Sequence, residues 1–291
     1  MLASVAMRRT AAFPYLFLAP YMAVFAVFWA WPIVQSILIS FQNTRTSPWR
    51  FQPGVNWGRL LNDAAFLGAL RNTFLILIVQ VPVMLMLATL LALALNSTML
   101  RARGLFRFAF FAPVVVGEVA YSAIFRLMFN GQFGAVNGVL GFFGLPAPDW
   151  LNHPWTATAV VIMAITWRWT GYNAVIILAG LQHIPGDLYE AASVDGVPRW
   201  RQHLSLTLPL LRPVLLFAFV LSIIGTMQLF AEPWLITMGG PGNATETLGT
   251  YLYRQGFTSM NFGYAATVAY AVAVLAGAFS AVQIILFGRQ R

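Results

Sequence analysis

Long, uninterrupted apolar stretches constrain this chain more than any other feature of its sequence. Each stretch is near or above the roughly 20 residues that an α-helix needs to cross the hydrocarbon core of a bilayer. The apolar residues run continuously and do not alternate, which favours helices over the strands of a membrane barrel. We therefore expect an all-α membrane protein with six transmembrane helices, at approximately residues 14–40, 68–95, 105–129, 155–181, 211–238 and 262–287.

The composition agrees with a chain that is solvated mainly by lipid. Only 9% of its 291 residues are charged, against roughly 25% in a soluble domain. The net charge of +9 does not indicate a nucleic-acid partner, because the arginines are spread among apolar stretches and form no basic face. The absence of cysteine excludes disulfides and thiolate metal sites. The residues show no catalytic or metal-binding constellation, so we expect neither.

The sequence predicts one membrane domain, residues 14–288, between short cytoplasmic ends at 1–13 and 289–291. The first apolar stretch is far longer than the ~7–15 residues of a signal peptide's apolar region, which indicates a retained helix. The distribution of arginine predicts that both termini are cytoplasmic. The segments then placed inside carry Arg8, Arg9, Arg101, Arg103, Arg107, Arg199, Arg201, Arg212, Arg289 and Arg291, whereas the outer loop with Arg45, Arg50 and Arg59 departs from the rule.

Residues 185–209 are unusually polar for a segment between two spans, and we interpret them as two short cytoplasmic helices. Asp187 is placed to cap the first helix, and Gly196 to end it. Pro198 then opens a second helix, which Pro209 ends or kinks. An apolar stripe of the second helix comprises Trp200, Leu204 and Leu208. From the residues alone, a plain interfacial connector explains this pattern as well.

The sequence "EAASVDGVPRWRQHLSLTLP", residues 190–209, resembles the EAA loop of ABC importer permeases. The residues that match the loop's pattern are Glu190, Ala191, Ala192, Gly196, Leu206, Leu208 and Pro209. Two further segments, "LAGLQHIPGDLYEAASVDG" and "TMGGPGNATETLGTYLY", are similar to permeases of the maltose and glycerol-phosphate type. The "GGPGNAT" segment is typical of the first of the two unlike permeases in such systems.

The resemblance implies a type I ABC importer permease fold with a cytoplasmic coupling helix, in the inner membrane of a bacterial cell. It implies a second homologous permease subunit, two copies of an ATPase subunit and an extracytoplasmic sugar-binding protein as partners. ATP and magnesium would then belong to the ATPase, and this chain needs no cofactor. The chain has no lysine, so it cannot contain a P-loop. The residues implied in coupling are Glu190, Ala191, Ala192, Asp195, Gly196, Arg199 and Pro209.

Polar residues inside the fifth apolar stretch are candidates for a substrate pathway, because such residues are costly in lipid. Small or polar residues recur at helical spacing, with Gln228 beside them. They are Ser222, Gly225, Thr226, Leu229 and Glu232. Packing through small residues, with hydroxyls bonded to their own backbone, explains Ser222 and Thr226 as well.

The fourth apolar stretch contains "TWRWTGYN", in which aromatic side chains suit stacking on a sugar ring. The candidate pathway residues here are Trp167, Arg168, Gly171 and Asn173, beside Trp169 and Tyr172. Structural packing is the alternative, with Arg168 paired to Glu118 or to Glu232. Arg126 lies eight residues after Glu118 and is another candidate partner for it. The sequence leaves these pairings open.

The function that the residues and the resemblance together favour is the permease subunit of an ATP-driven importer for a di- or oligosaccharide or a related sugar. An importer permease for a polyol phosphate, such as glycerol phosphate, remains open. An ion-gradient-driven secondary transporter is the alternative from another class. Secondary transporters commonly contain internal repeats, and the sequence shows none.

Overall fold

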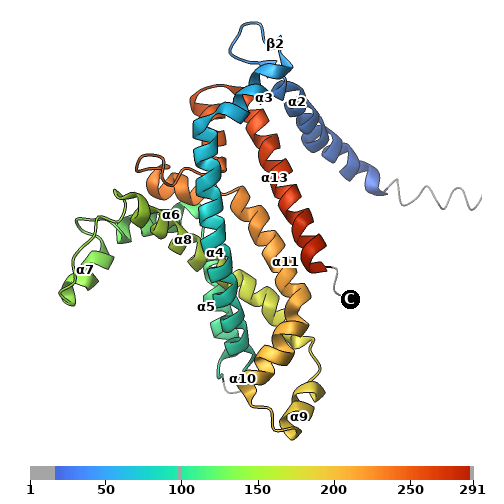
Figure 1. Cartoon of the computed structure of the whole chain (residues 1–291), viewed down its shortest axis with the longest axis vertical. Coiled ribbons are helices and arrows are strands. Elements are labelled where there is room, and N and C mark those ends of the chain that lie inside the picture. The colour runs from blue at the N-terminus through green and yellow to red at the C-terminus, as the bar shows by residue number, and fades with distance from the viewer. Residues whose placement is uncertain (1–16, 98–99, 289–291) are drawn as a thin grey trace, which may run out of the picture. The chain divides into compact units, whose positions relative to one another are not determined.

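The computed structural model describes residues 17–97 and 100–288 (Figure 1). The expected cytoplasmic ends, with Arg8, Arg9, Arg289 and Arg291, lie outside these described residues. The internal contacts divide the chain into two compact units. Unit 1 comprises Met1–Asn62 and Leu252–Tyr270, and unit 2 comprises Asp63–Tyr251 and Ala271–Arg291.

Unit 1 contains the first membrane helix, Phe17–Ser40, and a short polar region that follows it. The helix includes a π-helical turn, η1 (Ala26–Ala30), and continues as α2 (Trp31–Ser40). Two-residue strands then pair antiparallel, so the described chain is not wholly helical. The elements that follow the helix in unit 1 are β1 (Gln42–Asn43), β2 (Arg50–Phe51), α3 (Pro53–Asn62), η4 (Arg254–Thr258) and the first part of α13 (Phe262–Gly288).

Hydrogen bonds to the backbone hold unit 1 together. The side-chain amide of Asn56 donates to the carbonyl oxygens of Ser40 and Gln42, at 3.0 and 2.8 Å. The backbone N–H of Gly263 donates to the hydroxyl of Thr44 at 2.9 Å. A Cβ on Gly263 would lie 2.2 Å from the carbonyl oxygen of Gln42. Only glycine permits this close approach of two backbone segments.

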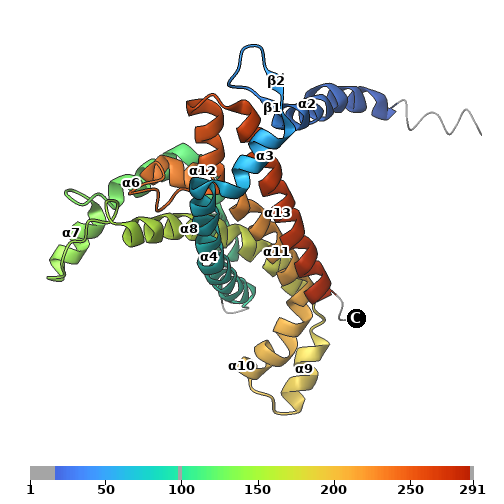
Figure 2. The ribbon, with the colours of Figure 1, turned by 45° about the horizontal axis from the view of Figure 1, so that its top comes forward.

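Unit 2 contains most of the membrane helices. Its longest helices, α4 and α8, pack along each other, and α11 lies against both (Figures 1 and 2). The side chain of Asp63 caps α4 by accepting hydrogen bonds from two backbone N–H groups of its first turn. The elements are α4 (Ala64–Asn96), α5 (Arg103–Val115), α6 (Glu118–Met128), α7 (Ala135–Phe142), α8 (Pro154–Gln182), α9 (Asp187–Val194), α10 (Arg199–Gln202), η2 (His203–Thr207), α11 (Leu208–Met227), η3 (Pro233–Thr237), the start of α12 (Leu248–Tyr253) and the remainder of α13.

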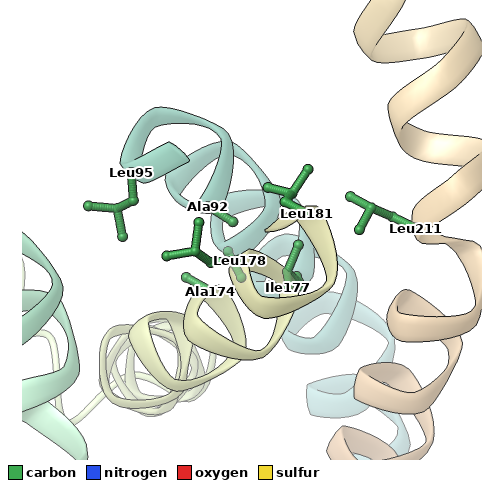
Figure 3. Close-up of a cluster of buried hydrophobic side chains, with 8 residues drawn as sticks. Ala92, Leu95, Ala174, Ile177, Leu178, Leu181 and Leu211 are labelled. Atoms are coloured by element: carbon green, nitrogen blue, oxygen red, sulfur yellow. The ribbon is translucent and has the colours of Figure 1, made fainter. Parts of the chain in front are cut away.

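A dry cluster of aliphatic side chains joins α4, α8 and α11 (Figure 3). Small and large residues alternate in it, so that the alanines of one helix receive the leucines of another. We call it the aliphatic cluster: Ala88, Ala92, Leu95, Ala174, Ile177, Leu178, Leu181 and Leu211, each at most 4% exposed. This packing fixes the three helices relative to one another.

Among residues 17–97 and 100–288, five helices are long and apolar enough to cross a membrane, and α5 with α6 makes a sixth if that bent pair is one span. The third span expected at 105–129 is divided into two helices, because α5 and α6 meet at 94°. Val116 and Gly117 have extended backbone between the two helices, and valine and glycine are weak helix formers. Glu118 then begins α6, where a negative charge is favourable.

The fifth span also differs from the expected 211–238. One helix runs from Arg199 through η2 to Met227, so it begins twelve residues earlier and ends eleven residues earlier. Pro209 does not end this helix, and it is the second residue after the π-helical turn η2, where the backbone hydrogen bonds change register. Beyond Met227 the chain turns at residues 228–230 and continues as a separate π-helical turn, η3, which Pro233 begins.

Candidate functional site: a polar cavity between the membrane helices

Unit 2 contains a cavity of about 370 Å³. It lies between α4, α6, α8 and α11, and residues 228–232, which begin with a non-helical turn, line it as well. The volume falls in the range of small-molecule sites. Its lining residues are Gln80, Met84, Glu118, Ile165, Trp169, Tyr172, Asn173, Leu221, Ser222, Gly225, Thr226, Gln228, Leu229, Phe230, Ala231 and Glu232.

The early end of α11 creates this cavity, because the chain beyond Met227 turns aside and does not fill the space. Irregular backbone at membrane depth is tolerated only where protein buries it or where it lines a cavity. Here the hydroxyl of Thr247 donates to the carbonyl oxygen of Leu229 at 2.6 Å. A Cβ on Gly249 would lie 2.4 Å from that same oxygen. The segment is therefore pinned closely against the start of α12.

Hydroxyl and amide groups from three helices face one another across the cavity. Thr226 on α11 donates to the backbone carbonyl of Ser222 at 2.8 Å and lies 3.4 Å from the amide oxygen of Gln80 on α4. The amide of Asn173 on α8 donates to the carbonyl of Trp169 at 3.0 Å. Gln80, Asn173 and Thr226 are each at most 6% exposed. Such convergent polar groups in an otherwise apolar cavity are typical of a binding site.

The aromatic residues of "TWRWTGYN" separate into two groups. Trp169 and Tyr172 line the cavity and meet edge to face, with ring centroids 5.6 Å apart. Trp167 instead packs against the rings of Tyr121 and Phe125, at 6.1 and 5.6 Å, and does not line the cavity. Trp167 was predicted as a pathway residue, but its contacts in the structure are those of a packing residue.

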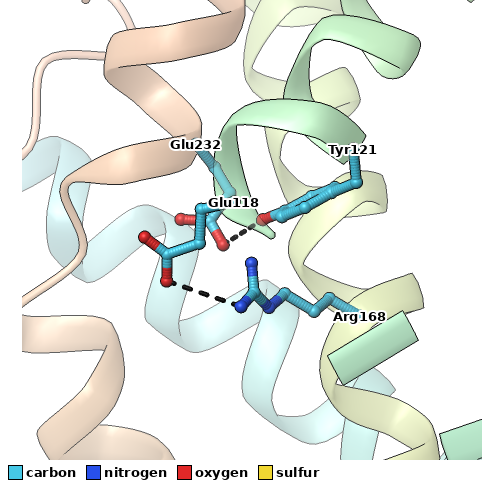
Figure 4. A network of polar contacts seen from close by, with 4 residues as sticks. All are labelled: Glu118, Tyr121, Arg168 and Glu232. Atoms are coloured by element: carbon cyan, nitrogen blue, oxygen red, sulfur yellow. Dashed lines mark hydrogen bonds and ion pairs between the residues drawn. The ribbon is translucent and has the colours of Figure 1, made fainter. Parts of the chain in front are cut away.

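Four polar side chains converge at one end of the cavity (Figure 4). A guanidinium nitrogen of Arg168 lies 3.5 Å from a carboxylate oxygen of Glu118. The phenol of Tyr121 donates a hydrogen bond to the buried carboxylate of Glu232. The guanidinium of Arg168 also lies over the Tyr121 ring, 4.8 Å from its centroid. This arrangement selects Glu118 among the partners that the sequence left open for Arg168.

Two further nitrogens of Arg168, Nε and Nη1, are buried and form no hydrogen bond with the described residues. Burying a guanidinium N–H group without a hydrogen-bond acceptor costs free energy, so a water molecule or a ligand is expected to accept from these nitrogens. Arg126 is exposed on α6 and outside the cavity lining. The alternative pairing of Arg126 with Glu118, and its place in the pathway, therefore find no support.

The structure thus brings together most of the pathway residues that the sequence suggested. Those that line the cavity are Ser222, Thr226, Gln228, Leu229, Glu232, Asn173 and Glu118. They do not share one helical stripe as expected, because Leu229 and Glu232 lie beyond the end of α11. Gly171 serves packing, since a Cβ there would lie 1.7 Å from the carbonyl oxygen of Phe110 on α5.

Sequence reasoning missed Gln80 and Met84, which bring α4 to the cavity. The amide nitrogen of Gln80 lies 3.3 Å from the sulfur of Met84. A glutamine within a 33-residue apolar helix was itself a signal, because uncompensated polar groups are rare in lipid. Among the described residues, no group of three or more histidine or acidic side chains is arranged to hold a metal ion.

The polar segment 185–209 forms two helices at one end of unit 2, where Figure 1 places α9 and α10. Gly196 follows the first helix with φ +73°, the left-handed conformation expected of a glycine that ends a helix. Asp187 does not cap α9 as expected, because it is the first helical residue and Gly186 precedes it without a side-chain cap.

Hydrogen bonds that the sequence did not suggest hold α9 against the second helix. The buried amide of Gln202 donates to the Ser193 hydroxyl and to the Val197 carbonyl, at 3.1 and 2.8 Å. The hydroxyls of Tyr189 and Thr207 are 2.9 Å apart. Of the suggested coupling residues, only Ala192 is buried, against this contact. The exposed ones are Glu190, Ala191, Asp195, Gly196, Arg199 and Pro209.

Comparisons with known proteins give this geometry a context. Residues 6–287 match the family described as "binding-protein-dependent transport system inner membrane component". The chain is 44% identical to the lactose transport system permease protein of Rhizobium radiobacter over 275 residues, which cover 92% of each chain. It is 34% identical to an arabinooligosaccharides transport system permease protein of Halalkalibacterium halodurans, over 94% of this chain and 87% of that one.

A solved structure shares the fold. One chain of a bacterial ABC transporter involved in the import of the acidic polysaccharide alginate superposes with a TM-score of 0.86, over 99% of both chains and at 22% identity. At this identity the likeness concerns the fold alone. The fold is that of an ABC importer permease, as the EAA resemblance implied.

Proposed function

Because the chain belongs to the family of binding-protein-dependent transport system inner membrane components, we propose that it is the permease subunit of an ATP-driven carbohydrate importer. The observation that carries this proposal is the cavity enclosed by α4, α6, α8, α11 and segment 228–232. A membrane protein that moves a hydrophilic solute needs polar groups shielded from lipid, and this cavity provides them. The lactose and arabinooligosaccharide names of its relatives support a sugar as the cargo.

The cavity favours an uncharged di- or oligosaccharide over an anionic one. The acidic side chains that line it are Glu118 and Glu232, whereas Arg168 lies at one end of the cavity, paired with Glu118 and outside the lining. A phosphorylated polyol would therefore meet two carboxyl groups and only one guanidinium, and like charges at close range repel. Trp169 and Tyr172 offer ring faces and edges, and Gln80 and Asn173 offer amides, which suit the C–H faces and hydroxyls of a sugar.

We propose that the α9 region receives force from a separate ATPase subunit, with two copies in the whole transporter. Its exposed residues include Glu190 and Ala191, whose small neighbour Ala192 lets α9 pack closely on the second helix. The exposed side chain of Val194, 88% accessible, gives this surface an apolar contact. A second, homologous permease and an extracytoplasmic binding protein complete the proposed assembly in a bacterial inner membrane.

The proposed orientation places α9 and both termini in the cytoplasm, because arginine is concentrated in the segments on that side. The loop from residue 130 to 154, which has no arginine, then lies outside. This orientation brings the coupling segment to the side where ATP is available.

The direct test is uptake by proteoliposomes that contain the complete transporter, its binding protein and ATP. Radiolabelled lactose and arabinooligosaccharides are the first neutral sugars to test, and a uronic-acid oligosaccharide is the anionic comparison. We expect ATP-dependent uptake of a neutral sugar and none of the anionic one. Uptake that follows an ion gradient without ATP would contradict the importer proposal. Uptake of the anionic sugar alone would contradict only the proposed cargo.

Gly196→Asp tests the coupling role. An aspartate must adopt a left-handed conformation there, at a cost of roughly 1–2 kcal/mol, and it adds a charge to the exposed surface. We expect the protein to insert and assemble but to lose uptake and sugar-stimulated ATPase activity. Gly196→Asn is the matched control, because asparagine tolerates this conformation better and carries no charge. Normal uptake by Gly196→Asp would contradict the coupling role.

A further inference from the structure

The segment between α6 and α8 contains several exposed large apolar side chains. We call residues 130–150 the α7 hairpin. Phe142 is 85% exposed and Phe143 is 70% exposed. Phe133, Val139 and Leu145 are each more than half exposed as well. Figures 1 and 2 show α7 at the far end of the branch that α6 and the start of α8 form.

The hairpin is uncharged over a long stretch. Residues 130–148, "NGQFGAVNGVLGFFGLPAP", contain no acidic, basic or histidine side chain. An exposed loop of a water-facing surface normally carries such groups, and a contiguous apolar patch marks a contact with protein or membrane. Charged residues are also what a segment at membrane depth must avoid.

The central polar side chain of the hairpin is bonded inward, which leaves the outer side of α7 apolar. Asn137, 8% exposed, donates to the carbonyl oxygens of Gly131 and Pro148, at 3.0 and 3.1 Å. The indole N–H of Trp150 donates to the side-chain oxygen of Asn137 at 2.7 Å. One buried side chain therefore ties together the beginning and the end of the hairpin.

The carbonyl groups at the end of α7 are also satisfied. The N–H of Leu145 donates to the carbonyl of Leu140 at 2.9 Å, and that of Gly144 donates to Gly141 at 3.0 Å. Gly144 has φ +69°, which completes a Schellman motif. Lipid contact requires this internal bonding, because the bilayer offers no partner for backbone groups.

From these observations we propose that the α7 hairpin is inserted in the lipid–water interface of the bilayer and anchors the bent α5–α6 pair there. Its position supports lipid as the occupant, because the hairpin joins the ends of two membrane segments and continues the exposed apolar side of α6, where Val119 and Leu127 lie. An interfacial helix buries one apolar face among the headgroups and acyl chains. This inference rests on the membrane fold and not on the proposed sugar cargo.

The absence of cysteine makes a site-specific test possible. Single cysteines replace Phe142, Ile78 on the exposed apolar side of α4 as the membrane standard, and the exposed Arg45 as the water standard. Each is labelled with an environment-sensitive fluorophore in the purified complete transporter, then reconstituted in phosphatidylcholine vesicles. The wild-type complex supplies the background from partner subunits.

We expect the label at Phe142 to emit at shorter wavelength than the label at Arg45, and lipids that carry a shallow spin label to quench it more than iodide does. Emission and iodide quenching like those at Arg45 would overturn the proposal, because the hairpin would then lie in water. Protection from both quenchers would overturn it too, in favour of a protein partner. Val139→Cys repeats the measurement if Phe142→Cys fails to assemble.

Discussion

The same three helices, α4, α8 and α11, build two very different regions of unit 2. Around the aliphatic cluster they are regular, dry and packed without polar groups. Around the cavity α11 ends, α6 is bent away from α5, and amides and carboxyl groups replace the leucines. The difference teaches that the cavity is not a defect of packing. It lies beside a firmly packed region that keeps the helices in place while the polar region remains open.

The largest expected loss of stability is at the aliphatic cluster. Leu178→Ala removes a side chain that is 3% exposed, so it leaves a cavity that the fixed helices cannot close. We expect a loss of about 2–5 kcal/mol, measured as a lower midpoint of thermal unfolding of the purified transporter. Leu87→Ala on the exposed side of α4 is the control, since lipid can fill the space that it leaves. Equal losses from both changes would show that the cluster does not fix the helices.

An intermediate change in the free energy of unfolding is expected from alanine substitution at two glycines. Gly171 lies in a closely packed contact and Gly225 lies at the cavity. Gly171→Ala places a Cβ 1.7 Å from the Phe110 carbonyl and should cost about 1–3 kcal/mol through overpacking. Gly225→Ala points into open space at the cavity, so its stability should stay the same or rise by up to about 1 kcal/mol, because alanine favours a helix.

Thermal unfolding and uptake by proteoliposomes separate the two glycine variants. We expect Gly225→Ala to lower uptake while it retains stability, since the added methyl group narrows the cavity. If Gly225→Ala unfolds at a lower temperature than Gly171→Ala, the distinction between a packed region and an open one does not hold.

The smallest expected loss of stability is that of Thr226→Val. Valine keeps the shape of threonine but removes the hydroxyl near Gln80, at a cost of about 0.5–1.5 kcal/mol. Uptake should nevertheless fall clearly, because a sugar loses a polar contact in the cavity. Thr158→Val is the matched control on α8, where the hydroxyl bonds only the Pro154 carbonyl at 2.9 Å and lies outside the cavity lining. If both variants transport equally well, the Thr226 hydroxyl does not serve the substrate.

The sequence predicted the membrane helices well wherever length and apolar character decide the outcome. It predicted α8 within one residue at each end, for example, and it predicted the turn at Gly196. The prediction was wrong at positions where a helix bends or ends within an apolar stretch. The bend before Glu118 and the end of α11 at Met227 both occur within apolar sequence, so hydropathy alone could not reveal them.

The candidate site was predictable only as a set of residue types. Costly polar residues in apolar spans pointed correctly to Thr226, Asn173 and Glu232 as lining residues. The same reasoning could not distinguish Trp167 from Trp169, because that distinction depends on which side of α8 meets α6. The pairing of Arg168 with Glu118 likewise depends on the bend between α5 and α6, which brings Glu118 to the start of a helix.

The continuous helix from Arg199 to Met227 connects the α9–α10 end of unit 2 to the cavity. Its 29 residues span about 43 Å at 1.5 Å per residue. Leu211, in the aliphatic cluster, lies about 18 Å from one end and about 24 Å from the other by the same rise. Because the cluster fixes α11 against α4 and α8, a displacement of the α9–α10 end moves the three helices together and reaches Thr226 at the cavity. A push at one side of the membrane is then carried to the cavity by the backbone of a single helix.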